Sequence, residues 1–268
     1  MTAPALLDWR SWAVLRRNAL VYLRNWRTAF LPPAFEPLVF FVALGLGLSG
    51  YVGAIDYGGR SIGYPTYVAA GILSYTCFTT PYFEGLYSAY VRMFYQKTWD
   101  GILATQVELH HILWGEILWA GVRGMMNAFV VAAVLGAVHA AGLVEIRWWW
   151  LPLLPPIGMV AGWTFAALSL IFTAIVPSID HMNYPVFLIG LPLSLVSNTY
   201  FPMPTQYEAV RVLAVLNPVY HLSETYRSAL VGGDVLGHLV ALLVTAAAYL
   251  AVLSGIAQRL MRRRVLGE

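Results

Sequence analysis

The chain has 268 residues, of which 59% are hydrophobic and only 11% are charged, whereas soluble domains carry about 25% charged residues. Its mean hydropathy is +0.67. A soluble chain of this length could not bury that much apolar surface, so the composition excludes a soluble domain and predicts a membrane protein. The net charge of +3 comes from arginines that flank apolar runs, which favours the positive-inside rule over nucleic-acid binding. The single Cys77 excludes an intrachain disulfide and a cysteine-based metal cluster.

Residues 8–27 form a helical pattern with two faces. One stripe carries Trp12, Leu15, Ala19, Tyr22 and Trp26, and the opposite one carries Arg10, Arg17 and Arg24. This pattern predicts an amphipathic helix at the membrane interface, with tryptophans at the lipid boundary and arginines towards anionic headgroups. The alternative is a soluble helix that covers another domain, although the sequence contains no second soluble domain for it to cover.

Six apolar runs follow, each near the ~20 residues that cross the hydrocarbon core. They are expected at 29–51, 64–90, 112–140, 149–176, 184–203 and 235–258. Most arginines lie before the first run, after the second and after the sixth, which places both termini in the cytoplasm. We therefore expect an all-α polytopic membrane protein with six transmembrane helices, in which residues 1–268 form a single transmembrane domain.

The segment 204–233 is too long and apolar for a simple loop, and too interrupted for another span. Thr205 and Glu208 form a capping box, Asn217 and Pro218 break the helix that follows, and a second helix ends at the glycine pair 232–233. The segment is interpreted as two short helices that dip into the outer leaflet.

The second apolar run contains Pro81, Glu84 and many aromatic residues. A proline and an acid inside one span predict a kinked helix whose polar side faces protein or water. Its aromatic residues either line a substrate path or pack between helices, and the path candidates are Tyr75, Phe78, Tyr82, Phe83 and Tyr87. In the fourth run, Gly158 and Gly162 have the spacing of a close helix contact.

Buried ionisable residues are the most informative group in this sequence. Glu116 and Arg123 lie seven residues apart, two helical turns along one face, so they should find partners on other helices. Glu84 is the candidate partner of Arg123. The three residues form either a polar pathway that rearranges as the helices move or a static, satisfied group.

The sequence offers little catalytic or metal chemistry of its own. It contains no GxxxxGK[ST] or GxGxxG pattern, so any ATP must bind to another chain. His110 and His111 are adjacent, which points them about 100° apart on a helix and disfavours a metal site. Ser178, Asp180 and His181 lie in one tight turn and cannot align as a hydrolase triad. No catalytic residue and no metal site is therefore assigned.

The stretch Gln96–Gly124 resembles a known family. A polar passage leads, after a helix-start signal at Asp100, into an apolar helix, and the matching positions are Leu103, Thr105, Gln106, Ile112, Gly115, Glu116, Trp119 and Ala120. Together with the closing section from residue 200 to 232, they resemble type 2 ABC-transporter permeases, most closely the branch of the nodulation-factor export permease. Gln106 stands where many relatives have proline.

This resemblance implies the membrane half of an ATP-driven exporter in the bacterial inner membrane. Two copies of the chain would form the pathway, and two copies of a separate ATPase subunit would hold ATP and Mg²⁺, with no cofactor on this chain. The family's gate helix maps onto 8–27 and its coupling loop onto 96–111. The implied ATPase contacts are Thr98, Trp99, Asp100, Leu103, Thr105, Gln106 and Glu108, with Asp180 and His181 as a second contact.

Two other functions are weighed against the exporter. A polytopic enzyme acting on lipid-linked sugars could use Glu84, Glu116 and Asp180 as acid or base. A passive channel would need rings of charge or a filter-like loop, which the sequence lacks. For the exporter, the branch resemblance implies an amphipathic substrate: a lipid-linked glycan, a lipo-oligosaccharide or a drug-like molecule.

Overall fold

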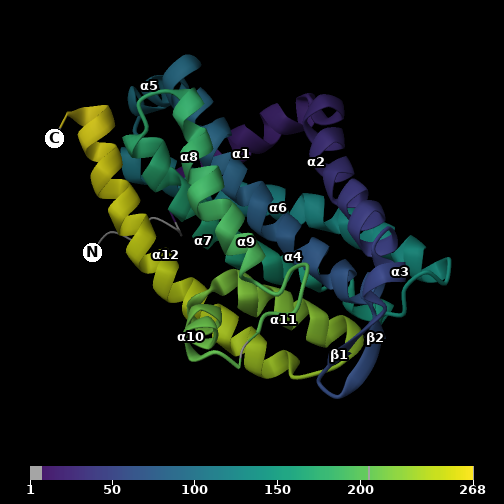
Figure 1. The fold of residues 1–268 in the computed structure, drawn as a ribbon. Coiled ribbons are helices and arrows are strands. Elements are labelled where there is room, and N and C mark those ends of the chain that lie inside the picture. Colours follow the sequence, from purple (N-terminus) through teal and green to yellow (C-terminus); the bar gives the residue numbers. More distant parts are fainter. Residues whose placement is uncertain (1–7, 205, 268) are drawn as a thin grey trace.

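In the computed structural model, residues 8–204 and 206–267 are described, without the side chains of residues 28–34. The fold is a bundle of helices with a β-hairpin at one end (Figure 1). In chain order the elements are α1 (Trp9–Arg24), α2 (Trp26–Phe40), α3 (Ser49–Val52), β1 (Ala54–Tyr57), β2 (Arg60–Gly63), α4 (Tyr64–Phe83), α5 (Thr98–Leu103), α6 (Leu109–Ala140), α7 (Leu154–Ile175), α8 (Asn183–Pro185), α9 (Leu191–Leu195), α10 (Glu208–Leu216), α11 (Pro218–Val231) and α12 (Val235–Leu266).

Helix α4 is the centre of the bundle and packs against α6, α7 and α11. Pro81 of α4 meets two glycines: a Cβ at Gly124 of α6 would lie 2.7 Å from the Pro81 ring, and one at Gly162 of α7 would lie 2.8 Å from it. Gly158 likewise leaves no room for a Cβ, which would overlap Cys77. The close contact predicted at Gly158 and Gly162 is therefore confirmed, and it fits proline and glycine together where the helices cross.

The helical segment that begins with α4 continues beyond its predicted end at residue 90. We call α4 together with this continuation, up to Tyr95, the long α4 helix. Three residues after Pro81 it becomes π-helical over Glu84–Ser88, and a second π-helical stretch, Val91–Tyr95, carries it past residue 90. Proline removes a backbone donor and crowds the turn that precedes it, whereas both π-helical stretches lie after Pro81. The π-helical stretches place Glu84 and Arg92 inside the bundle.

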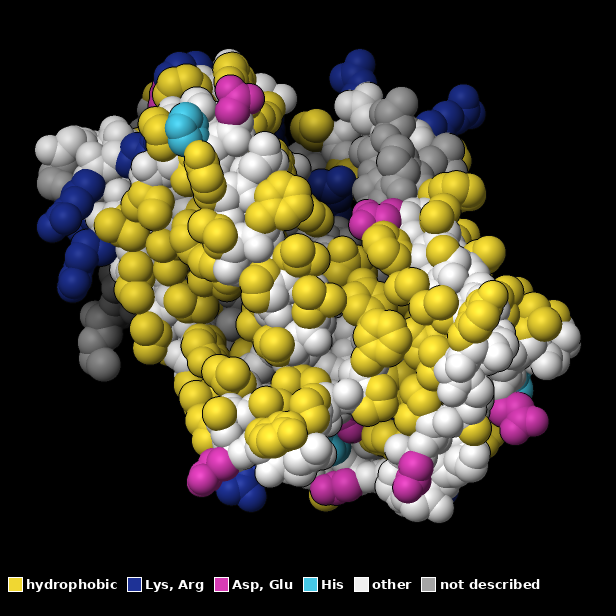
Figure 2. All heavy atoms as spheres, in the orientation of Figure 1, with side chains coloured by type: hydrophobic (Ala, Val, Ile, Leu, Met, Phe, Trp, Pro, Cys, Tyr) yellow, Lys and Arg dark blue, Asp and Glu magenta, His cyan; other side chains and the backbone are white. Residues whose placement is uncertain are grey.

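Four helical segments of the described residues are long and apolar enough to cross a membrane: Phe35–Val52, Leu109–Ala140, Leu154–Ile175 and Val235–Leu266. They overlap the first, third, fourth and sixth predicted spans. Figure 2 shows hydrophobic side chains over the middle of one face and charged ones near its two ends, the pattern of a surface that contacts lipid. The second and fifth predicted spans do not meet this criterion, so the count of six stays a prediction.

The fifth predicted span, 184–203, is too long. After α8, a π-helical stretch Val186–Gly190 leads into α9, and the helix ends at Leu195. Asn198 then adopts a left-handed conformation with φ of 54°. The sequence analysis also missed the β1–β2 hairpin, in which Ile55 pairs with Ile62 and two glycines with positive φ make the turn.

Helix α1 packs on α6. Asp8 caps α1 by accepting from the Arg10 amide at 2.9 Å, and it also contacts the His111 ring at 3.1 Å. The buried residues of α1 are Ser11, Val14, Asn18 and Tyr22. Trp12 remains about half exposed. Of the stripe predicted to face the lipid boundary, Trp12 and Trp26 are exposed and Tyr22 is buried. Val14 packs against Gly115 of α6.

The two short helices predicted between 204 and 233 are present as α10 and α11, with the break at Asn217 and Pro218 and the end at Gly232. Helix α10 begins at Glu208 after Tyr207, not at a capping box, and Thr205 lies outside the described residues. Helix α12 continues past the predicted residue 258 to Leu266. Arg264 explains the extension, because it donates to the carbonyl of Thr173 at 3.1 Å and ties α12 to the end of α7.

Candidate functional site

The loop 96–111 forms a short helix, α5, at one end of the bundle (Figure 1). Lys97 precedes it with φ of 51°, which turns the chain out of α4. The predicted contact residues lie at this end: Asp100, Thr105, Gln106 and Glu108 are exposed, and Thr98 and Leu103 are half-buried. Trp99 differs, because its side chain is 0% exposed. It cannot form part of a surface that another chain contacts.

The helix-start signal at Asp100 does not open the long helix. Asp100 lies in the first turn of α5, and α6 begins only at Leu109. Glu108 caps α6 in a reciprocal arrangement with His111, whose Nδ1 accepts from the Glu108 amide at 3.2 Å. The predicted surface stretch with its own helix start thus contains α5, and it leads through a turn into the long apolar helix α6.

Trp99 fixes α5 to the bundle through a buried carboxylate. Its Nε1 donates to Oε1 of Glu116 at 3.2 Å. Glu116 also accepts hydrogen bonds from Arg92, whose Nε lies 3.0 Å from Oε1 and whose second guanidinium nitrogen contacts Oε2. This two-pronged contact is the strong, geometrically specific form of an arginine–carboxylate pair.

Arg92 continues the connection to a second carboxylate. Its Nη1 donates to Oε1 of Glu84 at 2.9 Å, and Trp119 Nε1 donates to the same oxygen at 2.9 Å. Arg123 contacts the other oxygen of Glu84, so the contact predicted between these two residues is present. Glu84, Arg92, Glu116 and Arg123 together form what we call the ion-pair network. It holds two positive and two negative charges on α6 and on the two π-helical stretches that follow α4.

Arg92 is the residue of this network that sequence reasoning missed. It was counted only as a flanking charge, but its side chain is 12% exposed and bridges two carboxylates that are 1% and 2% exposed. A buried carboxylate requires a paired cation, and Arg92 follows Glu84 by eight residues, which is near two helical turns. That spacing was the available signal, although the π-helical insertions make it inexact.

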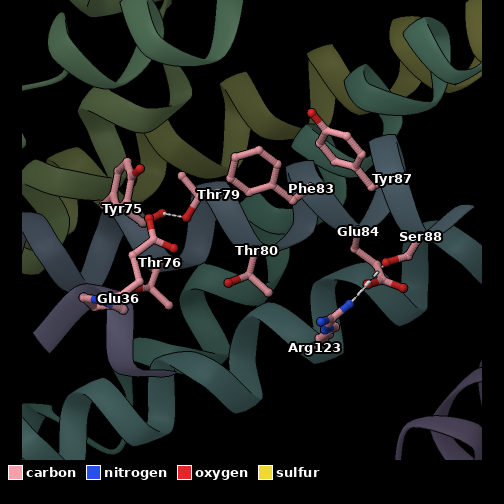
Figure 3. A pocket seen from close by; sticks show the side chains of 11 residues that line it. Glu36, Tyr75, Thr76, Thr79, Thr80, Phe83, Glu84, Tyr87, Ser88 and Arg123 are labelled. Carbon is pink, nitrogen blue, oxygen red and sulfur yellow. Dashed lines mark hydrogen bonds and ion pairs between the residues drawn. The ribbon is translucent and has the colours of Figure 1, made fainter. Parts of the chain in front are cut away.

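A cavity of about 310 Å³ lies at the far end of the network. We call it the upper cavity. Figure 3 shows Glu36 and Tyr75 at one side and the Glu84–Arg123 pair at the other, with Thr79, Thr80 and Phe83 between them. It is lined by α2, α4 and α6, and its mixture of aromatic, hydroxyl and charged groups suits a ligand with both apolar and polar parts.

The five predicted path aromatics divide between two cavities. Tyr75, Phe83 and Tyr87 line the upper cavity. Phe78 and Tyr82 are almost fully buried and, with Tyr75 and Phe83, line a smaller cavity of about 190 Å³ beside α9. Tyr82 also donates to the Pro185 carbonyl at 2.9 Å, and Phe78 packs edge-on against Phe165, so these two residues hold helices together.

The predicted second contact, Asp180 and His181, lies in an exposed turn at the same end as α5. The turn is tied to the end of the long α4 helix, because the Tyr90 hydroxyl donates to the Pro177 carbonyl at 3.0 Å. Ser178 and His181 contact each other at 2.7 Å within the turn.

A second buried charge cluster, which the sequence analysis did not find, lies at the hairpin end. Arg227 is 0% exposed and pairs with Glu224 one turn away on α11. The Tyr57 hydroxyl donates to Glu224 at 2.9 Å, and the Arg227 guanidinium lies 3.7 Å from the Tyr67 ring centre. Asn198 Nδ2 also donates to Glu224, at 3.2 Å. The cluster joins β1, α4, α11 and the chain after α9.

Comparison with known proteins gives one family. The sequence model described as "ABC-2 type transporter" matches residues 10–231. Nodulation protein J of Rhizobium leguminosarum bv. viciae is 30% identical, with 97% of this chain and 96% of the relative covered. Nodulation protein J of the bv. trifolii strain is 31% identical over 95% and 93%. The inner membrane transport permease YadH of Escherichia coli K12 is 21% identical over 79% and 78%. These matches confirm the resemblance that the sequence motifs carry.

Proposed function

Because the chain belongs to the ABC-2 type transporter family, we propose that it is the membrane subunit of an exporter that moves an amphipathic substrate out of the cytoplasm. The chain is a multi-pass membrane permease of the ABC transporter class. The family implies a separate ATPase subunit as its partner. In the proposal, two copies of each subunit assemble in the bacterial inner membrane, both termini of the permease are cytoplasmic, and ATP and Mg²⁺ bind to the ATPase.

The observation that carries this proposal is the connection from α5 to the upper cavity. The outer side of α5 is exposed and free to contact a partner, while its inner side is fixed through Trp99 to Glu116. From there the ion-pair network reaches Glu84 and Arg123, which line the cavity. A partner that moves α5 would therefore displace the network and change the cavity, which is the mechanical link an ATP-driven permease needs.

The upper cavity supports an amphipathic substrate. Tyr75 and Phe83 offer aromatic surface, and the Glu84–Arg123 pair offers charge at one side. The proposed substrate classes are a lipid-linked glycan, a lipo-oligosaccharide or a drug-like molecule, each of which combines an apolar and a polar portion.

A membrane enzyme is the second function considered, and the geometry disfavours it. General acid–base catalysis needs carboxylates that reach a substrate. Glu84 and Glu116 are both held by arginines inside the bundle, and Asp180 lies apart from them in an exposed turn. The three carboxylates therefore do not converge.

The test is reconstitution of the full chain with an ABC ATPase subunit of the same organism, in lipid nanodiscs, with measurement of complex formation and ATP hydrolysis. We expect a stable complex whose hydrolysis rate depends on the permease. Replacing Asp100 and Leu103 with arginine should abolish that dependence without unfolding the permease, because Asp100 is exposed and Leu103 is only half-buried.

Glu208→Arg is the matched control. Glu208 is an exposed acid on α10, at the opposite end of the bundle (Figure 1), so its reversal should leave ATP hydrolysis unchanged. If no ATPase associates with the wild-type chain, or if the Asp100/Leu103 variant and the control behave alike, the proposed coupling surface is wrong.

A further inference from the structure

A second cavity lies next to the upper one, between α1 and the end of the long α4 helix. Its volume is about 290 Å³, and its polar lining comprises Arg17, Asn18, Tyr87, Ser88, Arg92 and Gln96. We call it the α1 cavity. Tyr87 and Ser88 line both cavities, so a long molecule could occupy the two together.

The charges around the α1 cavity do not balance within the described residues. The ion-pair network is neutral, with two arginines and two glutamates. Arg17 is an additional cation: its guanidinium donates to Asn18 Oδ1 at 3.0 Å and lies 3.4 Å from the Thr98 hydroxyl, and neither partner is charged. Glu116 attracts Arg17 electrostatically, but it is already bound by Arg92 and Trp99. Arg17 is half-buried, and burial followed by repulsion from Arg92 lowers its pKa.

Asn18 supplies the second, independent observation. It is 4% exposed, and its Nδ2 has no hydrogen-bond partner in the described structure. Its orientation follows from Arg17, which occupies Oδ1. A buried donor without an acceptor costs free energy, as does a buried cation without a counter-ion. An anion with several oxygen acceptors would satisfy both.

The position of the cavity indicates where that anion comes from. Helix α1 contains Arg10, Arg16, Arg17 and Arg24 and no acidic residue. Its large apolar side chains Trp9, Trp12, Leu20 and Leu23 are exposed. Such a helix lies at the depth of lipid headgroups. Figure 2 shows basic side chains within a recess beside α2, in the upper part of the view.

We propose that the α1 cavity binds the phosphate-type anionic headgroup of the transported amphiphile, with Arg17 and Asn18 as donors and the less polar part of the molecule in the upper cavity. The inference rests on the proposed export function and specifies the chemistry of its substrate. Arg17 offers paired N–H donors suited to two oxygens of one phosphate, and Gln96 and Ser88 can complete the contacts.

The test measures lipid binding to the purified, delipidated full chain by native mass spectrometry. The probe is phosphatidic acid, with phosphatidylcholine of the same acyl chains as the comparison. Arg17→Gln should weaken phosphatidic acid binding by roughly tenfold, which is the loss of one charge-assisted contact of about 1.4 kcal/mol. Asn18→Leu, which keeps the shape but removes the donor, should weaken it by a smaller factor.

Arg16→Gln is the matched control, because Arg16 is an exposed neighbour on the same helix and its loss removes the same charge. Equal weakening by Arg16→Gln and Arg17→Gln would overturn the proposal, since general surface charge would then explain binding. Displacement of phosphatidic acid by inorganic phosphate at equal concentration would overturn the headgroup assignment in favour of a free-anion site. The assay uses neither ATP nor an ATPase, so its failure is separate from failure of the exporter proposal.

Discussion

Trp99 and Glu116 are 17 positions apart in sequence and joined by one hydrogen bond of 3.2 Å between the indole nitrogen and a buried carboxylate oxygen. Trp99 is the fully buried residue of a short helix whose other face is exposed, and Glu116 lies on a helix that passes through the bundle. In the proposed exporter, this bond would carry a movement of α5 into the core. The predictions that follow test the bond and the contacts beyond it.

Trp99→Phe tests the contribution of the hydrogen bond to stability separately from that of ring packing. The variant keeps an aromatic ring but leaves Glu116 without one donor, which costs about 1.5–3 kcal/mol for a hydrogen bond to a charged group. Trp163→Phe is the control, because the Trp163 Nε1 is buried without a hydrogen-bond partner in the described structure. Thermal unfolding in nanodiscs should show a larger loss for Trp99→Phe. Equal losses would mean that the indole bond contributes nothing.

Arg123→Ala should destabilise the permease, because it removes a cation from the almost fully buried Glu84. Neutralising the acid as well, in Arg123→Ala/Glu84→Gln, should restore part of the lost stability. The restoration is incomplete because Arg92 and Trp119 also bind Glu84. A double-mutant cycle should give a coupling free energy of about 0.5–3 kcal/mol. Strict additivity of the two losses would show that the contact carries no energy.

The pairing of Glu84 with Arg123 could be predicted from sequence, whereas the bridge through Arg92 could not. An acid and a base inside apolar helices must find each other, since lipid offers no alternative partner. Arg92 lies near the end of its apolar run, where a snorkelling arginine has the same pattern as a buried one. The two π-helical stretches place Arg92 inside the bundle, and no residue pattern in the sequence marks these stretches.

The fold likewise has features that could be predicted from sequence and features that could not. The long apolar helices were predicted because hydrocarbon imposes their length. The hairpin, the early end of α9 and the buried face of α1 depend on tertiary contacts, such as Gly115 receiving Val14. The cluster of Glu224 and Arg227 was missed because α11 carries so many polar residues that its almost complete burial was not expected.

Gly162→Ala should disturb the crossing of α4, α6 and α7. The new methyl group would lie 2.8 Å from the Pro81 ring and 3.4 Å from the Gly121 backbone, and neither can move easily. Overpacking of this kind costs about 1–3 kcal/mol. Gly255→Ala on α12 is the control, because a methyl group there meets none of the described residues within 4 Å, and it should raise stability by about 0.5–1 kcal/mol. A Gly162→Ala variant as stable as Gly255→Ala would show that the crossing is not tightly packed.

Tyr57→Phe should loosen the hairpin from α11. The Tyr57 hydroxyl lies 2.9 Å from a Glu224 oxygen and 3.0 Å from the Ser228 hydroxyl, and burial raises its pKa, so it stays protonated and donates at neutral pH. The variant removes both contacts and keeps the ring, which should cost about 1.5–3 kcal/mol because one partner is charged. Tyr51→Phe is the control, since Tyr51 is 89% exposed. Hydrogen exchange should rise in β1 and β2 for Tyr57→Phe only; equal exchange in the two variants would show that the hydroxyl does not anchor the hairpin.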